Sequence, residues 1–185
     1  GWLGIFLLFV LGIVWMGYFT NWGVHEVTFM DWAEITAPRL TLLRNAVTTW
    51  QLPLHISDPG TLHAATYRFL AVPDTLLSPQ MLLMRWMSVT RFNYFNLLLS
   101  YGAGFIGLLL LARRLRLSLV TFSFAFLLYN FNGNLLAHLS IGHVMWSATY
   151  LLSWFIWLML CLLDGERSWR WILMMAGLLT IIWLQ

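Results

Sequence analysis

Charged side chains are scarce in this sequence, and lysine is absent altogether. Of the 185 residues only 9% are charged and 61% are hydrophobic, whereas a soluble domain has about 25% charged and 45–50% apolar residues. This composition excludes an ordinary soluble domain and indicates a membrane protein. The basic residues are all arginines and are scattered apart from one cluster, so the formal net charge of +3 does not indicate a nucleic-acid-binding patch. We therefore expect no nucleic-acid partner.

Cysteine is nearly absent as well, since Cys161, within an apolar run, is the only one. A single cysteine cannot form an intrachain disulfide or a cysteine-rich metal site. We expect Cys161 to be a small, buried apolar residue. The short signatures of P-loop nucleotide binding, α/β-hydrolases and zinc proteases are also missing. The sequence therefore gives no sign of these common chemistries.

Long apolar runs predict the fold class, which is an all-α integral membrane protein built as a polytopic helix bundle. A membrane-spanning helix needs about 20 mostly apolar residues, and five segments approach or meet that length: 1–20, 94–112, 117–135, 144–163 and 171–185. The third runs into the polar stretch NFNGN, where we expect a break. In the second, Gly102, Gly104 and Gly107 offer a small-residue surface for close helix contact. We treat residues 1–185 as one membrane domain, and the missing initiator methionine and the end inside an apolar run predict a fragment.

The arginines predict the orientation of the chain. Short loops rich in arginine favour the cytoplasm, and two such loops are present: Arg113, Arg114 and Arg116 in the first, Arg167 and Arg170 in the second. Counting back through the spans predicts a cytoplasmic N-terminus. Residues 21–93 then form an outer loop, and residues 130–143 lie on the same outer face.

The outer loop of residues 21–93 holds most of the acidic residues: Glu26, Asp31, Glu34, Asp58 and Asp74. It also contains two amphipathic stretches, which we expect to be helices lying in the membrane interface with their apolar faces down. In the first, which starts near Pro38, one stripe is spaced by three and four residues: Leu40, Leu43, Val47 and Trp50. The second starts after a predicted N-cap, Ser78.

Asp31 and Glu34 are the candidate catalytic residues. They lie in the stretch FMDWAEITAPRL, and on a helix two residues three apart share a face. Carboxylates at the mouth of a membrane cavity can act as a general base or bind a divalent cation. The structural alternative is that both simply stabilise the first turn of a helix.

Two histidines, His138 and His143, form a possible metal or polar site in the second outer segment, on the same membrane face. They could be axial ligands of a haem or chlorin, or imidazoles hydrogen-bonded to backbone carbonyls. Arginines of the outer loop can bind phosphate or anchor the chain to lipid headgroups. Of these, Arg39, Arg44 and Arg91 are the candidates for binding a substrate phosphate.

Four stretches of the chain are informative together: MD at 30–31, QLPLHISDP at 51–59, GAGFIGLLLLARRLRLS at 102–118 and GHVMWSATYLLSW at 142–154. With the order of the features above, they resemble the N-terminal part of integral-membrane glycosyltransferases of the GT-C superfamily, in particular their YfhO-like branch. The chain departs from that pattern at Met30, where glycine is usual, and at His55, which replaces a tryptophan.

The resemblance implies transfer of a sugar from a polyprenyl-phosphate-linked donor to a lipid or polymer acceptor at the outer membrane face. It implies that Asp31, with Glu34 as second choice, is the catalytic base or helps to bind a cation. A divalent cation is the one cofactor it suggests. The expected partners are membrane lipids, the polyprenyl-phosphate sugar donor and other membrane proteins, and the expected location is the bacterial inner (plasma) membrane.

A second hypothesis is a non-catalytic transmembrane subunit that packs within a larger membrane complex and that could carry a pigment or haem. An enzyme should leave a polar cavity beside Asp31, whereas a packing subunit should bury that residue or pair it with another charge. A transporter or channel is disfavoured, because we expect no polar residues inside the spans apart from Asn130, Asn132 and Asn134.

Overall fold

The computed structural model describes residues 1–51, 78–165 and 168–184. Every regular element in those ranges is helical. The α-helices are α1 (Trp2–Phe19), α2 (Ala37–Thr49), α3 (Val89–Arg114), α4 (Leu119–Asn130), α5 (Gly133–Ile141), α6 (Leu152–Leu163) and α7 (Trp169–Trp183). Four shorter helical elements join them: η1 (Asn21–Gly23), the π-helix η2 (Trp32–Thr36), η3 (Pro79–Arg85) and η4 (Val144–Leu151).

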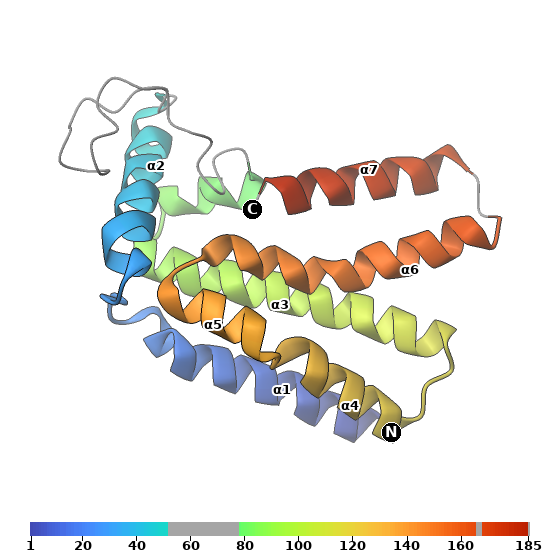
Figure 1. Ribbon diagram of the computed structural model, residues 1–185. Helices are drawn as coiled ribbons and strands as arrows, with labels where there is room; N and C mark the ends of the chain where they lie inside the picture. Colours follow the sequence, from blue (N-terminus) through green and yellow to red (C-terminus); the bar gives the residue numbers. More distant parts are fainter. Residues whose placement is uncertain (52–77, 166–167, 185) are drawn as a thin grey trace.

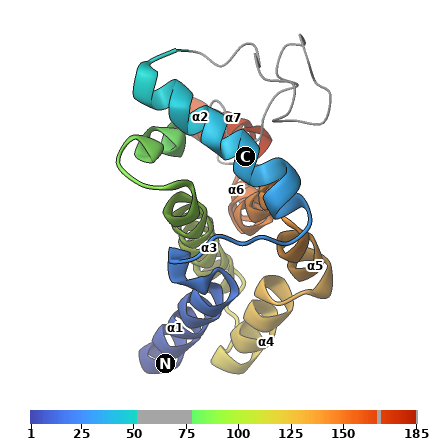
Figure 2. The ribbon, with the colours of Figure 1, turned by 90° about the vertical axis from the view of Figure 1, so that its left-hand side faces the viewer.

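The long helices run side by side as a bundle, and α2 lies across one end of it (Figures 1 and 2). Within the described ranges, four helical segments are long and apolar enough to cross a membrane: Trp2–Phe19, Val89–Arg114, Leu119–Ile141 and Val144–Leu163. This confirms the prediction of an all-α bundle and is compatible with an integral membrane protein. The fifth predicted span is represented by a shorter apolar helix, α7, of 15 residues.

Helix α3 is the centre of the bundle and packs most closely against α6 and η4. A Cβ atom on Gly104 would lie 2.4 Å from the carbonyl oxygen of Tyr150, and one on Gly107 would lie 2.4 Å from Oγ of Ser153. The hydroxyl of Ser153 also donates a hydrogen bond to the Gly104 carbonyl over 2.9 Å. The predicted small-residue contact is therefore confirmed at these two glycines. It is wrong for Gly102, because a Cβ atom there would have no neighbour within 4 Å.

Helix α1 also packs against α3, and Tyr101 of α3 makes a hydrogen bond to the backbone of α1. The buried hydroxyl of Tyr101 donates to the main-chain carbonyl of Phe9 over 2.9 Å. A Cβ atom at Gly12 would overlap that hydroxyl, so glycine is what allows the ring to reach the α1 backbone. The hydrogen bond satisfies a phenol that would otherwise be unpaired in an apolar core.

The third span is broken at the predicted polar stretch. Helix α4 ends at Asn130, and α5 begins after Asn132, whose side-chain oxygen accepts a hydrogen bond from the Leu135 amide over 2.8 Å. The side-chain amide of Asn132 also donates to the Tyr129 carbonyl over 3.0 Å. The side chain of Asn132 therefore hydrogen-bonds to a carbonyl and an amide that have lost their helical partners at the break.

Helix α2 confirms most of the predicted apolar stripe, since Leu40, Leu43 and Val47 are all buried. Leu40 and Leu43 pack against Met84 of η3 and Phe92 of α3, so protein covers this face. Trp50 was predicted to continue the stripe but is 72% exposed, because it ends the helix in the left-handed conformation. Its ring instead lies under the guanidinium group of Arg85.

The element after Ser78 is a 3₁₀-helix that ends at Arg85, where the sequence predicted a longer amphipathic helix. Ser78 occupies the N-cap position, but its side chain makes no capping hydrogen bond. The capping serine is Ser88, whose hydroxyl oxygen accepts from the Arg91 amide over 3.3 Å at the start of α3.

The arginine cluster lies at the end of the bundle opposite α2 (Figure 1). There Arg114 forms an ion pair with Asp164 and donates to the Leu160 carbonyl over 3.0 Å and to Cys161 Sγ over 3.2 Å. Cys161 is buried, as predicted. Arg167 of the second predicted cytoplasmic loop lies outside the described residues.

Candidate functional site

Asp31 and His143 meet at the end of the bundle that α2 crosses. Nε2 of His143 lies 2.8 Å from Oδ2 of Asp31, and Nδ1 of His143 lies 2.9 Å from Nδ1 of His138. The imidazole of His138 stacks on Trp146 with a centroid distance of 4.0 Å and an interplanar angle of 4°. The side chains of Asp31 and His143 are 33% and 34% exposed, so solvent can reach both residues.

Two side chains of the π-helix η2, which directly follows Asp31, fix that helix against the segment that carries His143. The indole Nε1 of Trp32 donates to the Leu139 carbonyl over 3.0 Å, and the Thr36 hydroxyl donates to the Gly142 carbonyl over 2.7 Å. Gly142 has φ +106°, and a Cβ atom there would lie 2.4 Å from the Trp32 amide nitrogen. Only glycine suits both the left-handed conformation and the close approach.

Met30, the residue before Asp31, has an uncommon backbone conformation, with φ +44°. This is the left-handed region, which costs a side-chain-bearing residue about 1–2 kcal/mol and which glycine adopts readily. The backbone therefore gives a physical reason for glycine to precede the acid, as it does in the YfhO-like pattern.

The tautomers of the two histidines decide which nitrogen donates in each of these hydrogen bonds. Against an ionised Asp31 carboxylate, which only accepts, His143 donates through Nε2–H. In the neutral imidazole the other nitrogen of His143 is then an acceptor, and the hydrogen between the two Nδ1 atoms belongs to His138. His138 Nε2 is left with a lone pair.

His138 lies in the last turn of α5, within the helical segment Leu119–Ile141, and His143 lies in the turn that follows. The sequence placed His143 and Asp31 on the same membrane face. It did not indicate that the two residues form a pair, because 112 positions separate them.

A metal or haem site receives little support from the described residues. Across residues 1–51, 78–165 and 168–184, no group of three histidine, cysteine, aspartate or glutamate side chains could hold a metal ion. Both ring nitrogens of His143 are in hydrogen bonds. An axial ligand needs a free ring nitrogen, so His138 Nε2 is the candidate left in this pair.

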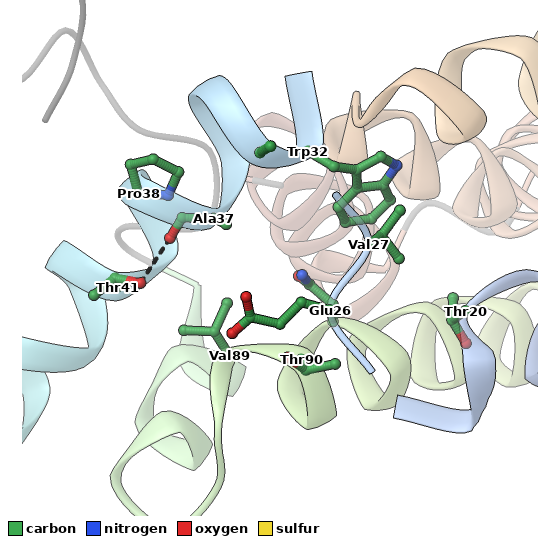
Figure 3. A pocket seen from close by; sticks show the side chains of 11 residues that line it. Thr20, Glu26, Val27, Trp32, Ala37, Pro38, Thr41, Val89 and Thr90 are labelled. Atoms are coloured by element: carbon green, nitrogen blue, oxygen red, sulfur yellow. Dashed lines mark hydrogen bonds between the residues drawn. The ribbon is translucent and has the colours of Figure 1, made fainter. Parts of the chain in front are cut away.

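A cleft of about 330 Å³ has Trp32, the neighbour of Asp31, in its wall, but Asp31, His138 and His143 do not line it. Figure 3 shows the carboxylate of Glu26 reaching into it from the segment after α1. The opposite walls contribute Thr41 from α2 together with Thr90 and Asn93 from α3. Glu26 was not among the predicted site residues, and its position outside any periodic stretch gave the sequence no reason to select it.

The remaining predicted site residues lie around this end of the bundle. Glu34 is exposed on η2, and a π-helical turn takes more residues than an α-turn, so it is rotated further from Asp31 than the predicted α-helix would place it. Arg39 and Arg44 are on α2, and Arg91 is exposed in the first turn of α3. The QLPLHISDP stretch, with His55, lies outside the described residues.

Buried polar groups occur inside the spans, contrary to the sequence-based expectation. Asn96 of α3 is 5% exposed and Ser147 of η4 is 2% exposed. Both line a cavity of about 10 Å³, the space that one water molecule needs. This polar spot is therefore large enough for one water molecule.

The described residues form a helical bundle that is compatible with integration into a membrane. At one end this bundle carries a site made of a carboxylate and imidazoles. Comparison of the chain with protein-family models, curated proteins and solved structures finds no match. The assignment of a function therefore depends on the geometry of the site and on the resemblance of the sequence stretches.

Proposed function

We propose that this chain is the catalytic-base portion of an integral-membrane glycosyltransferase of the GT-C type. It moves a sugar from a polyprenyl-phosphate-linked donor to a hydroxyl of a lipid or polymer acceptor at the outer membrane face. Asp31 is the base, and His143, itself in contact with His138, orients it.

The contact of 2.8 Å between Asp31 and His143 is the observation that carries this proposal. It joins two stretches, MD at 30–31 and GHVMWSATYLLSW at 142–154, which resemble the glycosyltransferase pattern independently of each other. The left-handed φ of Met30 supports the same reading, because that pattern has glycine at this position.

The chemistry needs one proton transfer and one exchange of bonds. The acceptor hydroxyl gives its proton to Oδ1 or Oδ2 of Asp31 as its oxygen bonds to the anomeric carbon of the sugar. The bond from that carbon to the donor phosphate breaks, and the polyprenyl phosphate leaves with the bonding electrons. His143 holds the carboxylate in place throughout through its Nε2 contact of 2.8 Å.

The cleft beside Trp32 suits a hydroxyl-rich group. Glu26, Thr41, Thr90 and Asn93 offer hydrogen-bonding groups on several sides, and the volume of about 330 Å³ is at the lower end of the range for small-ligand sites. An arginine of the outer segment, Arg39, Arg44 or Arg91, or a divalent cation would balance the charge of the leaving phosphate.

The test is sugar transfer by the full-length protein in membranes, with polyprenyl-phosphate sugar as donor. Asp31→Asn removes the base, so we expect the rate to fall by about 10²- to 10⁴-fold. Asp164→Asn, the same change at the opposite end of the bundle, is the matched control and should keep the parental rate. An unchanged rate in Asp31→Asn at equal expression would reject the proposal.

His143 is expected to act as a positioning residue. His143→Ala should lower the rate through a misplaced Asp31, and His143→Gln, which keeps a side-chain N–H donor, should restore part of it. His25→Ala, at an exposed histidine, controls for loss of an imidazole. Equal loss in His143→Ala and His143→Gln would show that the donor to Asp31 is not what matters.

A second candidate, a non-catalytic membrane subunit, is favoured by the same pairing. Asp31 is held by His143, and its helix docks through Trp32 and Thr36, which is what a packing role requires. Under this alternative Asp31→Asn leaves transfer by the complex intact but weakens copurification of its partners. The two candidates therefore give opposite results with one variant.

A further inference from the structure

The end of the bundle opposite Asp31 carries a pocket with a basic mouth and an apolar interior. It has a volume of about 340 Å³ and lies where the N-terminal end of α1, the C-terminal end of α3 and the start of α4 meet. Arg113 and Arg116 line it together with Ile5, Leu109 and Phe122. None of the described residues in its lining is acidic.

The arginines of this pocket are available to a ligand. Arg113 and Arg116 are both exposed, and the guanidinium carbon of Arg113 lies 5.4 Å from the centroid of the Trp2 ring. Stacking of this kind orients the cation without neutralising it. The neighbouring Arg114 is different, because it is already paired with Asp164.

An apolar groove of about 350 Å³ adjoins the pocket, since Trp2 and Ile5 line both. It continues between α1 and α3 past Phe6 and Ile106 to Gly102, where a Cβ atom would have no neighbour within 4 Å. From Gly102 to Arg113 the helix rises about 16 Å at 1.5 Å per residue. This is about half of the roughly 30 Å hydrocarbon core of a bilayer, the depth of one leaflet.

We propose that the pocket and groove bind one anionic phospholipid. Its phosphate lies between Arg113 and Arg116, and an acyl chain extends along the groove to Gly102. Charge complementarity selects the headgroup, because two exposed arginines without a carboxylate in the lining favour a phosphate. The groove selects a lipid over free phosphate. The lining comes from the ends of α1, α3 and α4, which lie at the end of the bundle away from α2 (Figure 1). The site does not depend on the proposed transfer activity.

Native mass spectrometry of the purified protein in mild detergent tests the headgroup. The protein is titrated with dioleoyl phosphatidylglycerol and, separately, with dioleoyl phosphatidylcholine. We expect the first lipid to bind at least tenfold more tightly. A basic side chain near a membrane surface changes binding to anionic lipid about fivefold, so the double variant Arg113→Gln, Arg116→Gln should weaken phosphatidylglycerol binding about 30-fold.

Arg170→Gln is the matched control, because Arg170 lies at the same end of the bundle, on α7, but does not line the pocket. It should change the affinity no more than about twofold. Equal losses in Arg170→Gln and the double variant would mean general surface attraction and would overturn the proposal. So would equal affinity of the parental protein for both lipids.

The groove is tested by filling it. Gly102→Leu should weaken binding of the long-chain phosphatidylglycerol at least fivefold and leave binding of its dihexanoyl analogue unchanged. Gly177→Leu, at another open helical glycine, is the control. Equal effects of Gly102→Leu on both chain lengths, or displacement of the lipid by equimolar inorganic phosphate, would contradict a lipid site. Retained burial of the Cys161 thiol confirms that each variant is folded.

Discussion

The contact between α3 and η4 can be tested with Gly102 and Gly104, two glycines of α3 that have different surroundings. A Cβ atom at Gly104 would lie 2.4 Å from the Tyr150 carbonyl oxygen and 2.9 Å from its carbon. These are backbone atoms, so α6 and η4 would have to move away. Gly102 lies two residues earlier with open space around it. Comparing Gly104→Ala with Gly102→Ala therefore separates the effect of crowding on stability from the intrinsic effect of replacing glycine in a helix.

Overpacking a close contact costs about 1–3 kcal/mol, whereas replacing glycine by alanine in a helix gains about 0.5–1 kcal/mol. We expect Gly104→Ala to lose roughly 1–2 kcal/mol and Gly102→Ala to be neutral or slightly more stable. At about 2–4 °C per kcal/mol for a chain of this size, Gly104→Ala should melt roughly 2–8 °C lower.

The single buried cysteine provides the assay. Cys161 is 3% exposed, so a thiol-reactive fluorescent dye reaches it only when the bundle opens. Heating each variant in the same detergent and following dye fluorescence gives the midpoint of unfolding. Equal midpoints for the two variants would refute the close backbone contact between α3 and η4.

Three further predictions concern particular contacts. Met30→Gly should raise the free energy of unfolding by up to about 1 kcal/mol, because glycine relieves the left-handed φ; a lower melting midpoint would contradict this. Gly142→Ala should undock Trp32 from α5, which an increase in solvent quenching of tryptophan fluorescence would report. Asp164→Asn should lower stability by no more than about 1 kcal/mol, since the Asp164 side chain is 70% exposed in its pair with Arg114; a larger loss in a melt at low salt would show that the pair is structural.

The sequence alone determined the fold class and much of the helix pattern. Apolar runs of about 20 residues require helices, because a chain in hydrocarbon must satisfy its backbone hydrogen bonds within each segment. The spacing of Leu40, Leu43 and Val47 determined the buried face of α2. The asparagines at 130–134 marked the break between α4 and α5. These are local properties, and local sequence carries them.

Only the tertiary structure decided which residues form a site. Asp31 and His143 are 112 positions apart, and their contact depends on how η2 docks against the turn at Gly142. The same holds for Gly102 and Gly104, since one faces open space and the other a backbone carbonyl although both have the same side chain. Periodicity says which face of a helix is apolar, but the partner of that face depends on packing between segments distant in the chain.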